Sequence, residues 1–119
     1  MHYLIDTNAW ISFFEDAPGL SDRAATLMES ASEECFVSIA SVWEAAIKVG
    51  LGKLALPYDL EGDLPRIFDE CGFSLLAVEF SDAVSVRDLP RLHGDPFDRI
   101  MVSQAKRRGW QVIGSDPAF

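Results

Sequence analysis

The chain has 119 residues, 49% of them hydrophobic, and carries a formal net charge of −9. This length and composition predict one folded domain with a hydrophobic core and exclude a disordered chain. No apolar run is long enough to span a bilayer, and the first residues lack the regions of a signal peptide, so a cytoplasmic protein is expected. The negative charge argues against a nucleic-acid ligand, but bound cations can restore positive potential locally.

Strand-like and helix-like segments alternate along the whole chain. In chain order, the predicted elements are a strand over residues 2–5, helices over 7–14 and 21–32, a strand over 35–38, helices over 39–49 and 59–70, a strand over 74–78, helices over 81–89 and 95–108, and a strand over 111–113. This alternation predicts an α/β fold with a parallel sheet and helices on its faces.

The last predicted helix has the clearest boundary signals. Asp95 is its predicted N-cap, Pro96 occupies the first helical position, and Gly109 is the predicted stop. The basic residues 106–108 complement the dipole at its C-terminal end, and we interpret them as a solvated helix end rather than an RNA groove.

Two other helices each have two possible starts. Ser81 or Asp82 is expected to cap the helix that ends near residue 89. Pro65 is inconsistent with one continuous helix over residues 59–70 and can instead mark a second helix start.

The cysteines and aromatic residues are predicted to be structural. Cys35 and Cys71 have neither the spacing of a metal site nor that of a disulfide framework, and both are expected to be buried, reduced thiols. Five aromatic residues are interpreted as core or interface anchors rather than as base-stacking platforms: Trp10, Phe13, Phe14, Trp43 and Phe68.

Four acids stand at the ends of apolar runs or just after them: Asp6, Glu44, Asp98 and Asp116. Because parallel strands end at one edge of a sheet, these side chains are expected to converge there. Converging carboxylates repel each other unless a cation neutralises them. The pattern therefore predicts divalent-metal chemistry and favours phosphodiester hydrolysis.

Each acid also has a structural explanation. Asp6 can cap the helix that follows it, and Asp98 can favour its helix N-terminus through the dipole. Glu44 can pair with Lys48 four residues later, and Asp116 can form a local turn with its own backbone. The site hypothesis therefore rests on the acids taken together.

Neighbouring polar residues are candidates for supporting the acids. Thr7 and Asn8 can hydrogen-bond Asp6 or hold metal-bound water. Arg99 can pair with one of the acids or lie near a substrate phosphate, and the ion pair is favoured.

With these motifs in order, the chain resembles the PIN-domain nucleases, and within them the VapC-like toxins of type II toxin–antitoxin pairs. Leu4-Ile5-Asp6-Thr7-Asn8 is similar to the first acidic motif of that family. The second, third and fourth motifs resemble residues 38–48, 93–105 and 112–116, respectively. The resemblance covers nearly the whole chain and implies a single PIN-like domain over residues 1–119 with a mainly parallel sheet of four to five strands.

The resemblance also implies a function and a set of site residues. It implies a metal-dependent endoribonuclease that uses Mg²⁺ or Mn²⁺, forms a homodimer and is inhibited by a cognate antitoxin. Asp6, Glu44, Asp98 and Asp116 match the catalytic and metal-binding quartet. Asp95 is an extra acid, and we favour Asp98 as the direct ligand, with Asp95 as cap or water-mediated ligand. The candidates for supporting or substrate-contacting roles are Thr7, Asn8, Ser38, Arg99 and Ser115.

The chain departs from the family pattern at two places. Gly114 stands where the fourth motif usually has Thr, and the chain stops at Phe119, where relatives continue into a final edge strand. Three alternatives therefore stay open: a catalytically impaired PIN-like module that binds metal or a partner, a plain structural domain, and a phosphatase with an aspartyl nucleophile. The phosphatase is disfavoured because Asn8 stands where a second Asp would be expected.

Overall fold

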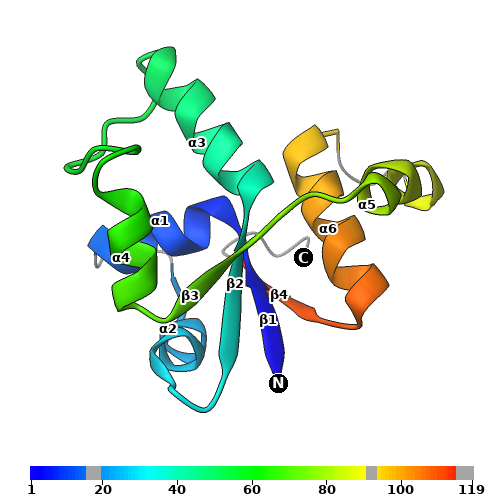
Figure 1. Cartoon of the computed structure of the whole chain (residues 1–119), viewed down its shortest axis with the longest axis horizontal. Coiled ribbons are helices and arrows are strands. Elements are labelled where there is room, and N and C mark those ends of the chain that lie inside the picture. The colour runs from blue at the N-terminus through cyan, green and yellow to red at the C-terminus, as the bar shows by residue number, and fades with distance from the viewer. Residues whose placement is uncertain (16–19, 91–93, 115–119) are drawn as a thin grey trace.

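The computed structural model describes residues 1–15, 20–90 and 94–114. Its elements are, in chain order, β1 (His2–Ile5), α1 (Thr7–Glu15), α2 (Asp22–Glu29), β2 (Glu34–Ser38), α3 (Ile39–Gly50), α4 (Leu64–Glu70), β3 (Phe73–Leu76), α5 (Phe80–Ser85), the 3₁₀ turn η1 (Val86–Asp88), α6 (Pro96–Arg108) and β4 (Gln111–Ile113) (Figure 1). The predicted α/β alternation is confirmed.

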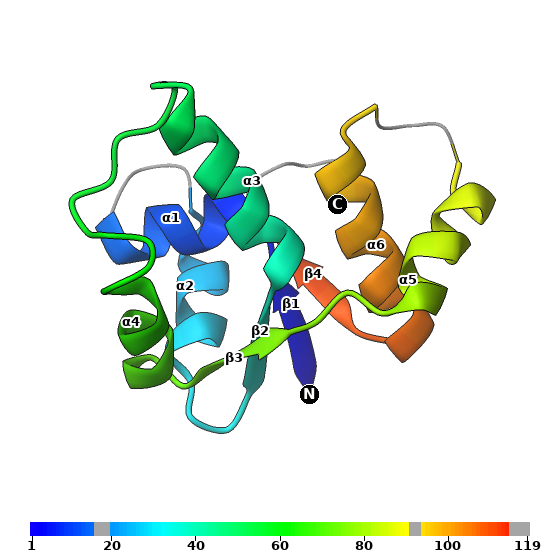
Figure 2. The ribbon, with the colours of Figure 1, turned by 45° about the horizontal axis from the view of Figure 1, so that its top comes forward.

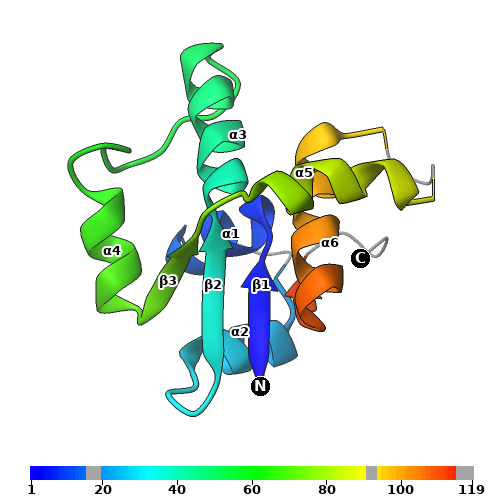
Figure 3. The same ribbon diagram turned by 45° about the vertical axis from the view of Figure 1, so that its right-hand side comes forward.

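The four strands form one parallel sheet in the order β3-β2-β1-β4. In register, Ile5 of β1 lies between Val37 of β2 and Ile113 of β4. The strands therefore point the same way and end at one edge (Figure 3). Helices α1 and α3 begin at this edge, directly after β1 and β2, and α6 runs back from it toward the start of β4.

Alternation along the central strand divides the core between the two faces of the sheet. Ile5 packs into a large cluster with Trp10 and Phe68, whereas Leu4 packs with Met101 on the other face. In Figure 2, α1, α2 and α4 accordingly gather on one side of the sheet and α5 and α6 on the other.

The aromatic and cysteine predictions have mixed outcomes. Trp10 and Phe68 are buried, with ring centroids 5.2 Å apart, as expected for core anchors. Trp43 is 62% exposed and is therefore not a core residue. Cys35 is buried as predicted, but the prediction for Cys71 was wrong: it is exposed because it caps the end of the short helix α4. Both are free thiols.

Two helices are shorter than predicted. The helix over 59–70 was wrong in its first part, since α4 begins at Leu64 with Pro65 in its first turn, as the alternative start had it. Before it, Asp59 accepts a hydrogen bond from the Gly62 N–H and its own N–H donates to Asp63, which stabilises a turn instead of a helix. Helix α2 ends at Glu29 rather than near residue 32, because its C-cap Ser30 has extended backbone.

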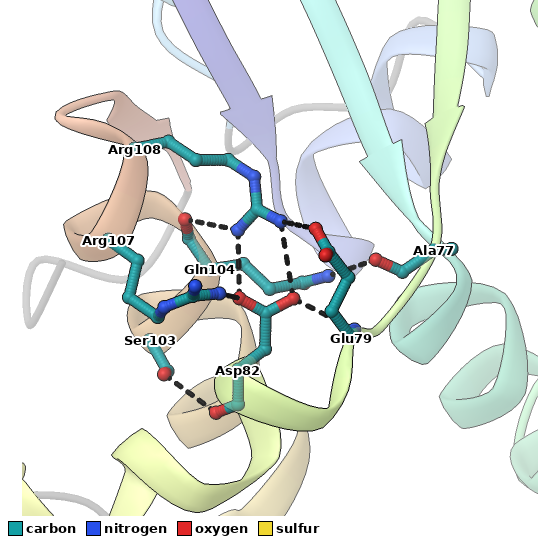
Figure 4. Close-up of polar contacts among 7 residues, drawn as sticks. All are labelled: Ala77, Glu79, Asp82, Ser103, Gln104, Arg107 and Arg108. Atoms are coloured by element: carbon teal, nitrogen blue, oxygen red, sulfur yellow. Dashed lines mark hydrogen bonds and ion pairs between the residues drawn. The ribbon is translucent and has the colours of Figure 1, made fainter.

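Asp82 joins α5 to α6, and this role was not predicted (Figure 4). The N-cap of α5 is Glu79, not Ser81 or Asp82, and its N–H donates to Asp82 Oδ2 over 2.9 Å. The Asp82 carboxylate is fully buried and also accepts hydrogen bonds from Arg107 and Arg108. The interpretation of residues 106–108 as merely solvated was therefore wrong for these two arginines.

Other contacts extend this link between the two helices. Arg108 also reaches Glu79 Oε1 at 2.7 Å, and its guanidinium lies 5.7 Å from the centre of the Trp110 ring. Ser103 donates to the Asp82 carbonyl oxygen over 2.8 Å, and Gln104 donates to the Ala77 carbonyl oxygen over 3.2 Å. The C-terminal half of α6 is thus held to α5 by a network of charged and polar groups.

Burial alone would raise the pKa of Asp82, but hydrogen bonds from Arg108, the Glu79 N–H and Arg107 outweigh it and hold the pKa at about 2. A lowered pKa in the folded state stabilises the protein above the unfolded value of 3.8. This stability is lost as the pH falls from about 4 toward about 2.

No helix in the described ranges is both long and apolar enough to cross a membrane.

We predict that Asp82→Asn lowers the free energy of unfolding by about 2 kcal/mol at pH 7, less than for a fully buried pair because both guanidiniums reach solvent. Urea unfolding at pH 7 and pH 3 measures this change. The difference from wild type shrinks at pH 3, because this pH lies below the unfolded pKa of 3.8 and the unfolded chain then binds a proton that the folded carboxylate does not. Asp88→Asn is the matched control, because Asp88 is 75% exposed in its pair with Arg87. Equal losses in the two variants would contradict the role of Asp82.

Candidate functional site

Asp6 lies where β1 passes into α1. Its Oδ1 accepts a hydrogen bond from the Ala9 N–H over 2.7 Å, so the predicted capping role is confirmed. The residue is only 3% exposed, at the edge where the strands end. The cap holds this carboxylate in a fixed place at the start of α1.

Glu44 is buried although it lies on a helix with an exposed face. It is 6% exposed, and its two oxygens have different partners. The Thr7 hydroxyl donates to Oε1 over 2.6 Å, and Lys48 Nζ lies 3.0 Å from Oε2. Because Thr7 directly follows Asp6, its hydrogen bond brings the first acidic motif against the second.

The predicted i,i+4 pair of Glu44 with Lys48 is therefore present. It accounts for one oxygen of the carboxylate, and the contact with Thr7 links residues 37 positions apart in the sequence. A carboxylate that has lost most of its water requires such partners. The hydrogen bond to Thr7 is consequently part of what holds α3 against α1.

The serine pair at the start of α3 orients this helix. Ser38 caps α3 by accepting a hydrogen bond from the Ala40 N–H over 3.0 Å. Ser41, which the sequence reasoning missed, is fully buried, donates to the Ser38 carbonyl oxygen and accepts from the Trp10 indole N–H over 3.0 Å. Its spacing of three residues from Ser38 was the available signal, since it places both on one side of the first turn.

The start of α6 supplies the third motif. Asp95 is the N-cap, as predicted, and its Oδ1 accepts from the Phe97 N–H over 2.8 Å and from the Asp98 N–H over 3.4 Å. Asp98 lies half-buried in the first turn. Arg99 donates to the carbonyl oxygens of Val86 and Pro90, over 3.1 and 2.9 Å, and so ties the loop after η1 to α6.

A hollow of about 300 Å³ lies between α3 and α6. Its lining residues are Glu44, Ile47, Lys48, Asp95, Pro96 and Phe97. Trp43 borders it, because its ring meets the Phe97 ring edge-on with centroids 5.1 Å apart. The second and third acidic motifs, which are separated by about half the chain, therefore share one surface depression.

Two predicted site residues, Ser115 and Asp116, lie outside the described residues, so the fourth motif is represented by Gly114 and the end of β4. Asn8 is exposed on α1. Over residues 1–15, 20–90 and 94–114, no three His, Cys, Asp or Glu side chains are grouped closely enough to hold a metal ion.

The chemistry of the donors nevertheless fits a hard divalent cation. Asp6, Glu44, Asp95 and Asp98 offer carboxylate oxygens, the ligands that Mg²⁺ and Mn²⁺ prefer. Mg²⁺ usually keeps several waters and binds one or two carboxylates, so it does not require a cluster of three protein ligands. Asp6 and Glu44 fit this requirement best, since both are buried and are linked through Thr7.

A family model decides the classification of this chain. The model of the PIN domain matches residues 3–119. The chain belongs to the PIN-domain family. This match confirms the family and the fold that the sequence motifs predicted.

Two solved structures share the fold. A crystal structure of VapBC2 from Rickettsia felis, bound to a DNA fragment from its promoter, has a TM-score of 0.64 at 13% identity, covering 94% of this chain and 86% of that one. A toxin–antitoxin complex from Klebsiella pneumoniae has a TM-score of 0.58 at 15% identity, covering 92% and 82%. Comparison with curated protein sequences gave no match.

We predict that Thr7→Val lowers the free energy of unfolding by about 1 kcal/mol, because the buried Glu44 carboxylate loses its hydroxyl donor while the side-chain shape is kept. Thermal or urea unfolding measures the change. Thr26→Val is the control, since Thr26 makes an exposed hydrogen bond to the Asp22 carbonyl oxygen. Stability equal to wild type in Thr7→Val would show that this contact does not hold α3 to α1.

Proposed function

We propose that this PIN-domain protein is a metal-dependent endoribonuclease and the toxin of a toxin–antitoxin pair. The observation that carries the proposal is the buried Glu44, bonded to Thr7 beside Asp6 and sharing a hollow with Asp95. These residues belong to three separate acidic motifs. Asp6 and the start of α3 lie at the edge where the parallel strands end, and Glu44 and Asp95 line the hollow between α3 and α6. The proposed reaction is hydrolysis of an RNA phosphodiester bond, without a covalent enzyme intermediate.

Mg²⁺ or Mn²⁺ would be held by Asp6, Asp98 and Asp116, with Glu44 bound directly or through water and Asp95 as cap or water-mediated ligand. When bound, the ion supplies an activated water and neutralises charge at the phosphate. The protein contributes fixed positions for the ligands. The backbone at the start of α1 holds Asp6, and the Thr7 hydroxyl fixes which way Glu44 points. Asp98 is held by the first turn of α6, which Asp95 caps.

An antitoxin is the proposed protein partner. The structurally similar proteins are VapBC2 from Rickettsia felis and a toxin–antitoxin complex from Klebsiella pneumoniae, and a chain with a net charge of −9 attracts basic segments of a partner. We predict that a basic side chain of the antitoxin enters the acidic site and blocks it. Co-expression with antitoxin variants that lack Arg and Lys near the site measures this effect as lost inhibition of RNA cleavage. Full inhibition by those variants would contradict it.

We also propose a cytoplasmic homodimer. The support is a set of large exposed apolar side chains among the described residues, which includes Trp43 on α3, Leu51 directly after it and Phe80, 84% exposed, on α5. Such side chains can form the apolar centre of an interface.

The proposed activity is tested with an end-labelled mixed RNA pool incubated with Mg²⁺, Mn²⁺ or EDTA. We predict metal-dependent cuts by the wild type and an approximately 100-fold slower reaction in Asp6→Asn. Asparagine is as good an N-cap as aspartate, so this variant keeps the start of α1 while it loses the charge.

Asp88→Asn is the matched control, because it removes an exposed carboxylate that belongs to none of the acidic motifs, and it should cut at the wild-type rate. Cuts that persist unchanged in Asp6→Asn would overturn the site assignment. Metal binding without any RNA cleavage by the wild type would favour the catalytically impaired module instead.

A further inference from the structure

Most basic groups of α6 are already engaged within the protein. Arg107 and Arg108 bind the buried Asp82 carboxylate at the C-terminal end of the helix. Arg99, the substrate candidate predicted from the sequence, directs its guanidinium to the carbonyl oxygens of Val86, Leu89 and Pro90. These arginines therefore serve the packing of α5, η1 and α6.

Lys48 is placed differently. It is the one basic residue among the described residues that line the hollow between α3 and α6. Its side chain is 41% exposed, and its ammonium is held 3.0 Å from Glu44 Oε2. An ammonium has three N–H donors, and the ion pair with Glu44 uses only one direction in space. Solvent or a ligand in the hollow can therefore reach the same nitrogen.

The ion pair with Glu44 keeps Lys48 beside the hollow but leaves its ammonium available to a second partner. Pairs spaced by four residues on a helix contribute little to stability, so the pair does not prevent a contact with a ligand. A phosphate oxygen offers the ammonium an equally charge-assisted hydrogen bond. RNA that enters a hollow with Glu44 and Asp95 meets two carboxylates, and Lys48 compensates part of the repulsion.

We propose that Lys48 is a substrate-binding residue whose ammonium contacts a backbone phosphate of RNA in the hollow between α3 and α6. This inference rests on the proposed nuclease function. Lys48 is held near the site by Glu44 before RNA binds, so its side chain is partly ordered in advance. The contact is to the phosphate backbone and is independent of base identity.

The test measures RNA affinity against salt concentration. A labelled single-stranded RNA is titrated with protein in the Asp6→Asn background, which slows cleavage, and fluorescence anisotropy gives the dissociation constant at several salt concentrations with Mg²⁺ present. The slope of log K against log salt is negative, and loss of one phosphate contact lowers its magnitude by about 0.7 for single strands. We predict this decrease for Lys48→Met, together with weaker binding to RNAs of every sequence, whereas Lys48→Arg keeps the wild-type slope.

Lys106→Met is the matched control. It removes the same charge from an exposed position ten residues further along α6 than Pro96, roughly 15 Å away along the helix axis. Its slope should equal that of the parent, and thermal melting confirms that each variant is folded.

Two failures can be told apart. An unchanged slope and unchanged affinity in folded Lys48→Met overturns the role of Lys48, even when the wild type cuts RNA. A wild type that neither binds nor cuts RNA overturns the proposed function itself. A Lys48 that serves only as an ion-pair partner of Glu44 would change stability and leave the slope untouched, which also overturns the inference.

Discussion

A buried carboxylate has to be given partners, and this requirement organises the edge of the sheet around Glu44. The partner that matters most is Thr7, which begins α1, while Glu44 lies in the second turn of α3. Both helices start without a linker from neighbouring parallel strands, whose spacing of about 4.8 Å fixes how far apart their first turns can be. The contact between the two motifs is therefore a consequence of strand order.

The position of α6 depends on a second buried carboxylate. Asp82 binds Arg107 and Arg108 at the C-terminal end of α6, whereas Asp95 and Asp98 lie at its N-terminal end. A helix of 13 residues is stiff over this length, so an anchor at one end also sets the place of the other. The two networks thus have different roles: one fixes the acids of α1 and α3, and the other fixes the acids of α6 relative to them.

Local signals were enough to predict most elements. The helix from Asp95 to Arg108 was predicted correctly because the cap, the proline and Gly109, whose φ of 72° favours glycine, all act within a few residues. The roles of Asp82 and Arg108 were missed, since the partners are 26 residues apart and no periodicity connects them. Trp43 was predicted to be a core or interface anchor, and the sequence could not decide between the two, because an apolar sequence neighbourhood does not show which face of α3 is covered.

The candidate site was likewise predictable where the signal is local and not where it depends on long-range contacts. The acids, and the pairing of Glu44 with Lys48 one turn away, were evident from sequence spacing. The hydrogen bond from Thr7 and the hollow shared with Asp95 depend on tertiary packing, which spacing cannot give. The sequence also could not show which acids cap helices and which bind metal. Asp6 and Asp95 act as caps in the structure, and a capping carboxylate can also lie beside a metal ion.

The net charge of −9 constrains how the proposed site would bind the RNA substrate that we propose for it. At physiological salt, charges farther apart than about 8 Å are largely screened, so distant acids of the body repel RNA only weakly and the charges inside the hollow dominate the interaction. Binding should then involve a short stretch of backbone rather than an extended groove. A basic protein segment is attracted by the same body over its whole surface, which gives a protein inhibitor an electrostatic advantage over the substrate. One charge distribution can therefore keep the substrate contact local and favour a basic partner.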